Sequence, residues 1–199
     1  PGPVLTATFL AGFGGILYYV VLGFVPTILD TYSDIQSDTA LWVTTGMTIV
    51  YAVATPFFGL LSDRVGRKPT LIGASIGFVV LSFPLLWLMT NEPVWIVVLA
   101  GLALLSLLML YGGPVVAAIG EQFPSRARYS ALATGYNLGT AVLGGFAPLV
   151  AAWLISVFDT PIAPAGLLVV ASLIALPLLL RLKETRGITL AEMDQQAPR

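Results

Sequence analysis

Long apolar stretches without charge alternate with short clusters of charged residues along the chain. Each uncharged stretch contains at least 21 residues, and together they cover 1–29, 39–62, 69–91, 93–120, 129–158 and 160–180. About 20 apolar residues are enough for a helix to cross the hydrocarbon core of a bilayer. Because lipid offers backbone groups no hydrogen-bond partners, a spanning segment is a helix or part of a closed barrel. Barrel strands alternate in polarity, and Leu99–Leu110 does not alternate.

The pattern therefore predicts an all-α membrane protein, a bundle of six transmembrane helices over residues 1–183. The expected spans are about 5–29, 40–61, 69–90, 94–119, 130–157 and 162–181. Residues 184–199 are polar and short, and we expect them to form a cytoplasmic tail.

The basic residues predict how the bundle is oriented. All nine Lys and Arg residues follow the second, fourth and sixth spans. In the loops after the first, third and fifth spans, every charged residue is acidic. Loops rich in Lys and Arg stay in the cytoplasm, so both termini are expected there. The four tryptophans fall near the expected outer interface, where indole rings are favoured. We therefore expect an integral protein of the plasma membrane, which in bacteria is the inner membrane.

Composition narrows the function classes. Only 10% of the residues are charged, compared with roughly 25% in soluble domains. The net charge of −1 argues against a nucleic-acid partner. The chain has no Cys and no His, which removes thiolate chemistry and the commonest metal ligand, so we expect no metal site and no cofactor. An intramembrane enzyme would need a nucleophile–base pair or metal ligands within a span, so an enzyme is not expected.

Polar residues within the spans are candidates for the path of a solute. In the second span Thr44, Thr48, Tyr51 and Thr55 share one helix face. Small and hydroxyl-bearing residues are also the usual packing surface between membrane helices, and that alternative stays open. The candidates for the substrate path are Tyr19, Thr48, Tyr51, Tyr111, Tyr136 and Asn137.

Gly112-Gly113-Pro114 lies within the fourth span. Proline removes a backbone hydrogen bond and clashes with the preceding turn. The triplet predicts either a static kink or a hinge, as in the discontinuous helices of transporters.

Three charged motifs follow the even-numbered spans. The first is Gly59-x-x-x-Asp63-Arg64-x-Gly66-Arg67-Lys68, in which Gly66 is expected to turn the chain and Asp63 to pair with a base or cap a helix. The second contains Glu121, Pro124 and Arg128, and the third is Lys183–Gly187.

These motifs resemble the major facilitator superfamily. G-x-x-x-D-R-x-G-R-K is similar to its cytoplasmic loop signature, and E-x-F-P-x-x-x-R to a loop two spans later. Tyr136-Asn137 and Gly144–Pro148 resemble the metabolite:H+ symporter branch, which includes proline/betaine, α-ketoglutarate, citrate and shikimate carriers. Pro56–Gly59 and Phe24–Thr27 are similar to the proline/betaine carriers.

The resemblance implies a twelve-helix carrier of two six-helix halves, each an inverted 3+3 repeat. This chain would be the C-terminal half, with the N-terminal half as its partner, and the Pro-Gly-Pro start without Met agrees with a missing upstream part. It implies a cytoplasmic gate in which Asp63 latches the halves together. The candidate gate residues are Gly59, Asp63, Arg64, Gly66, Arg67, Lys68, Glu121 and Arg128.

The expected function is secondary transport of small organic acids or zwitterions by alternating access, with H+ as the coupling ion. Proton coupling requires a titratable group within the membrane, and these spans contain no Asp, Glu, Lys, Arg or His. Either the coupling residue lies in the other half of the carrier, or transport is not driven by protons. The alternative is a six-span scaffold or sensor, or a fragment that does not transport.

Overall fold

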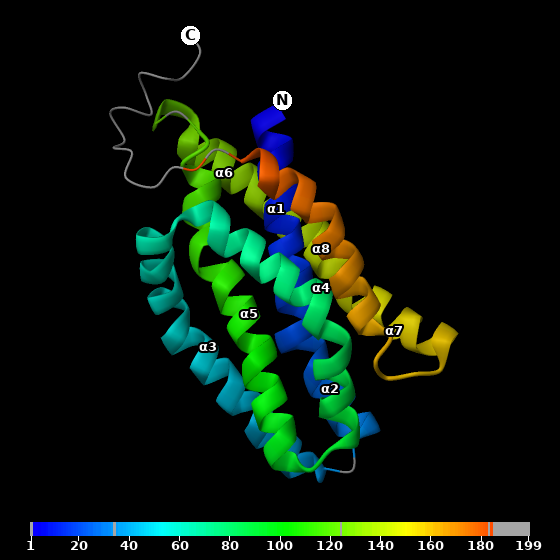
Figure 1. Cartoon of the computed structure of the whole chain (residues 1–199). Helices are drawn as coiled ribbons and strands as arrows, with labels where there is room; N and C mark the ends of the chain where they lie inside the picture. Colours follow the sequence, from blue (N-terminus) through cyan, green and yellow to red (C-terminus); the bar gives the residue numbers. More distant parts are fainter. Residues whose placement is uncertain (1, 34, 124, 183, 185–199) are drawn as a thin grey trace.

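A computed structural model describes residues 2–33, 35–123, 125–182 and 184 of the chain. The side chains of residues 2, 3, 125–128 and 131 lie outside this description. The described residues form helices joined by short turns, and they include no strand (Figure 1). The tail over 185–199 and Asp34 of the first acidic loop lie outside the described residues.

Six hydrophobic helical spans make up the bundle. The first span consists of α1 (Gly2–Tyr18), the π-helical segment η1 (Tyr19–Phe24) and α2 (Val25–Tyr32). The next three are α3 (Ser37–Val65), α4 (Arg67–Asn91) and α5 (Val94–Gly120). The fifth consists of α6 (Ser125–Gly139), the π-helical segment η2 (Thr140–Gly144) and α7 (Gly145–Phe158), and the sixth is α8 (Pro164–Arg181). All six are long and apolar enough to cross a membrane, so the predicted six-helix membrane fold is confirmed.

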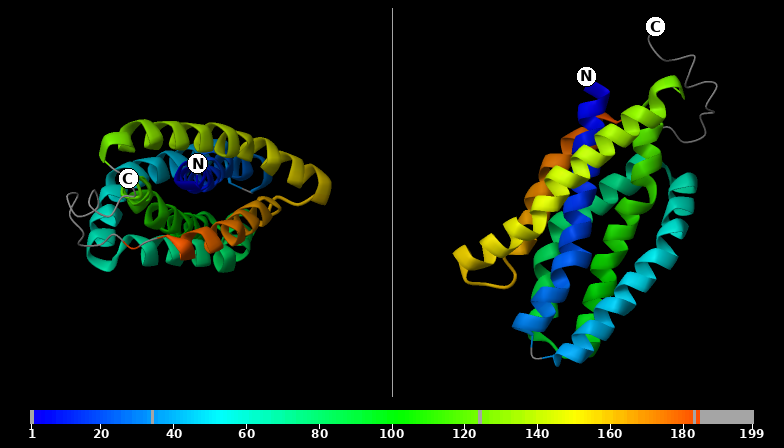
Figure 2. Two further views of the ribbon diagram at one scale, coloured as in Figure 1. Left: turned by 90° about the horizontal axis from the view of Figure 1, so that it is seen from above. Right: turned by 180° about the vertical axis from the view of Figure 1, so that it is seen from behind.

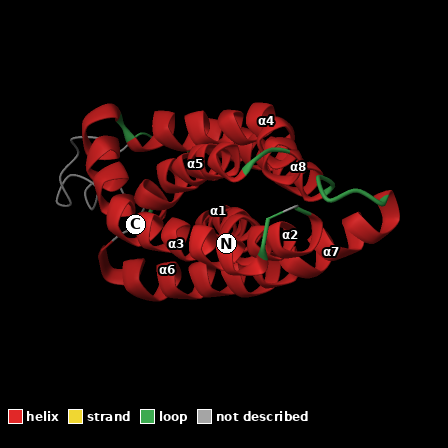
Figure 3. Cartoon of the chain, turned by 90° about the horizontal axis from the view of Figure 1, so that it is seen from below, coloured by secondary structure: helices red, strands yellow, loops and turns green. Residues whose placement is uncertain are grey.

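The first and fourth spans form the centre of the bundle. Helix α1 packs against α6 and η2 on one side and against α5 and α8 on the other (Figure 2). Helix α5 packs against α3 and α4, and α4 also packs along α8 (Figure 3). By contrast, only 6% of the most apolar window of α3 is buried, compared with 50% for the first span. Helix α3 thus presents most of its surface outward.

The two π-helical segments were not predicted, and each precedes a proline. Proline has no N–H and its ring clashes with the carbonyl four residues earlier. Pro26 and Pro148 direct this clash at Leu22 and Gly144, which belong to η1 and η2 respectively. A widened turn relieves the clash, and such π-bulges frequently occur at functional sites.

Glycines allow α1 and the fifth span to approach backbone to backbone. A Cβ atom placed on Gly139 would lie 2.1 Å from the carbonyl oxygen of Thr8. A Cβ on Gly15 would lie 3.0 Å from the Cα atom of Gly144. We call Gly12, Gly15, Gly139 and Gly144 the glycine seam. It fixes the spacing of two of the spans that carry candidate site residues.

Gly66 forms the turn between α3 and α4 with φ of +124°. This backbone conformation is accessible to glycine and strained for other residues, as the sequence motif predicted. A Cβ at this position would also meet the Glu184 carboxylate at 2.8 Å.

Candidate functional site

Four tyrosines from three different spans gather where α3 and α6 flank the central helices. We call Tyr18, Tyr19, Tyr51 and Tyr136 the tyrosine cluster. The Tyr18 ring contacts Tyr19 edge to face, with centroids 5.5 Å apart and an angle of 89° between the planes. It also contacts Tyr51 of α3, with centroids 5.6 Å apart. From α6, Tyr136 lies in the neighbourhood of Tyr19, Tyr51 and Tyr111.

The tyrosine cluster lies near the middle of the helical spans that carry it. Tyr19 is near the middle of the span Val4–Tyr32, and Tyr51 is near the middle of Ser37–Val65. About two fifths of Tyr18 and Tyr19 is exposed, at 40% and 39%. Substrate sites of secondary transporters lie near the bilayer midplane, so the cluster has the depth and the exposure of such a site.

Two further candidates are close in sequence to tyrosines of the cluster, and both are exposed. Thr48, one turn before Tyr51, is exposed, and its hydroxyl donates to the Thr44 carbonyl at 2.9 Å. Asn137, next to Tyr136, is also exposed.

Tyr111 occupies a different environment from the other candidates. It is fully buried, its ring packs edge to face on Phe13 at 4.8 Å, and its hydroxyl donates to the Leu10 carbonyl at 2.8 Å. These contacts join α5 to α1. We therefore treat Tyr111 as a packing residue and not as part of a solute-facing wall.

Arg67 is the centre of a charge network at the turn between α3 and α4. Its guanidinium forms an ion pair with Asp63 and a second one with Glu121 at 3.4 Å. It also donates to the Ser62 hydroxyl at 2.5 Å and to the Gly59 carbonyl at 3.5 Å. Of the two roles expected for Asp63, pairing with a base is the one observed. The network connects the ends of α3, α4 and α5.

Glu184 connects the end of the last span to the same network. Its carboxylate accepts hydrogen bonds from the backbone N–H groups of Arg67 and Lys68, at 3.1 and 3.0 Å. Lys68 in turn donates to the Leu180 carbonyl at 2.6 Å. A carboxylate at a helix N-terminus is favoured by the free N–H groups and by the helix dipole.

The remaining gate candidates are less involved in these contacts. Arg64 is exposed at the end of α3. Arg128 belongs to α6, but its side chain lies outside the described residues.

At Gly112-Gly113-Pro114, α5 runs from Val94 to Gly120 without interruption. A Cβ on Gly113 would lie 2.7 Å from the Gly59 nitrogen, and one on Gly112 would lie 2.9 Å from the Tyr51 hydroxyl. These two glycines therefore allow α3 to pack closely against α5. The helix has no break here, and a hinge at this position stays a prediction.

Sequence reasoning missed two residues of these sites. Tyr18 connects Tyr19 to Tyr51, and its signal was the adjacent pair of tyrosines. Glu184 binds the start of α4, and its signal was the charged motif that begins at Lys183. In both cases the partner is more than 30 residues away in the sequence, so only the fold reveals the contact.

Comparison with known proteins gives the same family for nearly the whole chain. Residues 4–198 match the family model described as the Major Facilitator Superfamily. The chain is 31% identical over 187 residues to the proline/betaine transporter of Salmonella typhimurium, covering 91% of this chain and 37% of that protein. It is 30% identical over 184 residues to a glycine betaine/proline/ectoine/pipecolic acid transporter of Dickeya dadantii, covering 90% and 36%.

A citrate-proton symporter of Klebsiella pneumoniae is 30% identical over 139 residues, or 69% of this chain and 31% of the symporter. These relatives are transporters, not enzymes. The chain spans a little more than a third of the length of the curated relatives it matches.

Proposed function

Because the chain belongs to the Major Facilitator Superfamily, we propose that it forms one half of a secondary transporter for small zwitterions, with the tyrosine cluster as part of the substrate site. One observation carries the proposal: tyrosines of the first and second spans are in ring contact near the middle of their helices, on a face where Tyr18 and Tyr19 are partly exposed. Alternating access would then expose this face to each side of the membrane in turn.

The chemistry of the tyrosine cluster favours a substrate with a diffuse positive charge. The uncharged stretches around it contain no fixed charge that could pair with an anion, and a buried anion without a partner is costly. Aromatic faces attract quaternary ammonium groups, with about 0.5–1 kcal/mol at exposed sites and about 2 kcal/mol or more once desolvated. Tyr18 and Tyr19 stand at 89° to each other, so their rings form two walls of a corner for such a group. This supports betaine-like zwitterions over citrate.

Proton symport is a further part of the proposal. A coupling group has to titrate within the membrane, and these spans contain no Asp, Glu, Lys, Arg or His between their charged ends. We place that group in the N-terminal half of the carrier. Proton-driven uptake by residues 1–199 alone would contradict this assignment.

We also propose that the Arg67 network is the cytoplasmic latch of the carrier. It gathers Asp63, Glu121 and Glu184 at one end of the bundle, where the basic loops predict the cytoplasmic side. Its contacts to three other segments would have to rearrange when that end opens.

The test uses single cysteines, which react cleanly because the chain has none of its own. Thr48→Cys and Asn137→Cys are next to residues of the tyrosine cluster and remove no ring, and Asn91→Cys, exposed at the end of α4, is the control. In proteoliposomes, we expect glycine betaine to slow maleimide labelling at the first two positions and not at the control. Citrate should leave all three rates unchanged.

A second pair of variants separates ring contact from general packing. Tyr19→Phe, added to each of the two cysteine variants, keeps the aromatic face, so protection by betaine should persist. Tyr19→Leu in the same variants should abolish it. Labelling that no solute changes at either position would favour the scaffold alternative. Protection by citrate equal to that by betaine would contradict the zwitterion assignment.

A further inference from the structure

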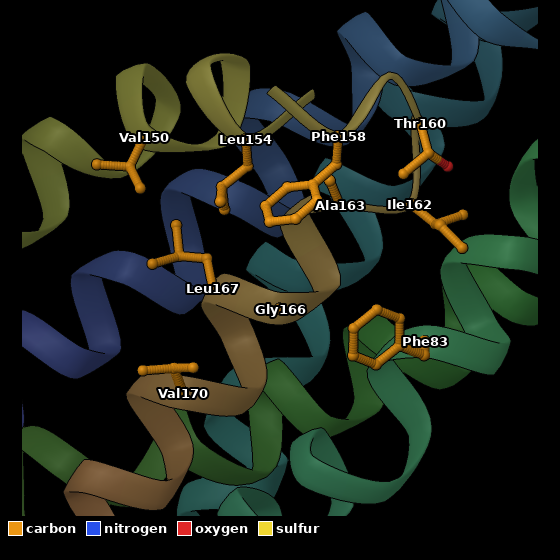
Figure 4. A pocket seen from close by; sticks show the side chains of 10 residues that line it. All are labelled: Phe83, Val150, Leu154, Phe158, Thr160, Ile162, Ala163, Gly166, Leu167 and Val170. Atoms are coloured by element: carbon orange, nitrogen blue, oxygen red, sulfur yellow. The ribbon is translucent and has the colours of Figure 1, made fainter. Parts of the chain in front are cut away.

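An apolar groove is lined by residues of α4, α7, α8 and the turn between the last two helices. In Figure 2, α3 and α7 lie at opposite ends of the bundle. The volume of the groove is about 520 Å³, within the range of roughly 300–1,000 Å³ typical of small-molecule sites. Helices α4, α7 and α8 and the turn between the last two provide its walls (Figure 4). Its lining residues are Phe83, Val150, Leu154, Phe158, Thr160, Ile162, Ala163, Gly166, Leu167 and Val170.

The groove opens to the surroundings of the bundle. Phe158, Val170 and Phe83 are exposed by 64%, 54% and 45%. All three belong to candidate membrane spans, so the mouth of the groove faces the bilayer at that depth.

Water does not suit this groove. Ordered water in a protein site needs two to four polar partners, whereas apolar cavities stay dry and take up apolar ligands. Thr160 is the one hydroxyl-bearing residue of the lining. It lies at one end of the groove in Figure 4, beside the exposed Asp159 that ends α7. The walls are therefore hydrocarbon along the groove, with polar groups at one end only.

We propose that one acyl chain of a bilayer phospholipid occupies this groove, with its headgroup at the Thr160 end. An acyl chain joined to a polar headgroup has the same distribution of apolar and polar parts as the groove. Two protein segments are weaker candidates for the groove. The polar C-terminal tail of the protein begins at the Arg181 end of α8, whereas the groove is lined by the first half of α8. The proposed second half of the carrier would cover α3, which lies at the other end of the bundle.

An acyl chain here would fill the space between α7, α8 and α4. It would support α7, whose buried side chains are Ala147, Ala151 and Ile155. The lipid is thus expected to act as a structural ligand of the bundle.

The first test uses the unmodified chain in phosphatidylethanolamine–phosphatidylglycerol vesicles that contain a phospholipid with a photoactivatable diazirine on its acyl chain. After illumination, we expect labelling at Phe83, Leu167 and Val170 several-fold above that at Leu173 and Ile174. The last two are matched controls on α8, exposed by 51% and 61%. Equal labelling per exposed side chain would overturn the proposal.

The second test fills the groove from within. A Cβ on Gly166 would meet its nearest atom, Phe83 Cζ, at 3.9 Å, so Gly166→Leu adds volume without a backbone clash. We expect this variant to lose the excess labelling and to lose a phospholipid adduct in native mass spectra. Gly46→Leu on α3, where nothing lies within 4 Å, is the control and should keep both. Loss of the signals in both variants, or in neither, would overturn the proposal.

Discussion

At the scale of single residues, the Arg67 guanidinium is the contact that holds the Gly66 turn together. Its side chain is 18% exposed, and it serves Asp63 and Glu121 at once. Arg67→Ala would remove both ion pairs and the hydrogen bonds to Ser62 and Gly59. Hydrogen bonds to charged groups contribute about 1.5–3 kcal/mol, so we expect a loss of about 1–3 kcal/mol in the free energy of unfolding in micelles.

Arg64→Ala is the matched control for this prediction, because Arg64 is exposed three residues earlier. Exposed substitutions of this kind usually change stability by less than about 0.5 kcal/mol. Equal losses in the two variants would show that net charge matters at this turn, and not the specific contacts of Arg67.

Tyr111 allows packing and solute contact to be separated by experiment. Its buried hydroxyl joins α5 to the Leu10 carbonyl of α1, and such interhelical bonds in membranes contribute about 0.6 kcal/mol on average and about 1.7 at most. Tyr111→Phe should therefore lower the free energy of unfolding by about 1 kcal/mol. It should leave protection of Asn137→Cys by betaine unchanged. A change in that protection at full stability would return Tyr111 to the substrate path.

At the scale of helices, the glycine seam sets the distance between α1 and the fifth span. Gly139→Ala would place a methyl group 2.1 Å from the Thr8 carbonyl oxygen, so the two backbones must separate. Overpacking of this kind costs about 1–3 kcal/mol or more. Thermal unfolding in micelles should show a clear loss for this variant.

Gly145→Ala is the control on the same span, since nothing lies within 4 Å of a Cβ there. Alanine favours a helix over glycine by about 0.8–1 kcal/mol, so this variant should be neutral or slightly more stable. If Gly139→Ala were as stable as Gly145→Ala, the close approach of α1 to α6 would be incorrect.

The helices themselves could be predicted from the sequence because a bilayer imposes a simple rule on length and polarity. The turn at Gly66 could be predicted too, since few residues accept its backbone conformation. The π-helical segments could not, because they depend on how Pro26 and Pro148 are accommodated. The tyrosine cluster was predicted only in part. Polar stripes show which residues share a face, whereas the contact of Tyr18 with Tyr51 depends on how two spans cross.

At the scale of the whole molecule, the distribution of exposed apolar surface indicates where a partner would bind. Helix α3 and the fifth span are the least buried spans, with 6% and 22% of their apolar windows inside the bundle. Both also carry residues of the tyrosine cluster or its border, including Tyr51, Thr48 and Asn137. A second six-helix half placed against α3 and α6 would enclose the cluster in a central cavity, as expected for two inverted-repeat halves, and would leave the groove beside α7 to the bilayer.

Whether α3 is shielded from lipid therefore shows whether a second half, and not the bilayer, covers this helix. Val53→Cys and Phe57→Cys lie on α3 and are exposed by 63% and 65%, and Ile174→Cys on α8 is exposed by 61%. We would join the chain to the first six spans of the Salmonella typhimurium relative and measure quenching of a probe on each cysteine by lipid-soluble nitroxides. Quenching on α3 should fall relative to the chain alone, while quenching on α8 stays the same. If the probes on α3 were still quenched as strongly as the probe on α8, the exposed side of α3 would be a lipid-facing surface. Some other part of the protein would then have to separate the tyrosine cluster from the bilayer.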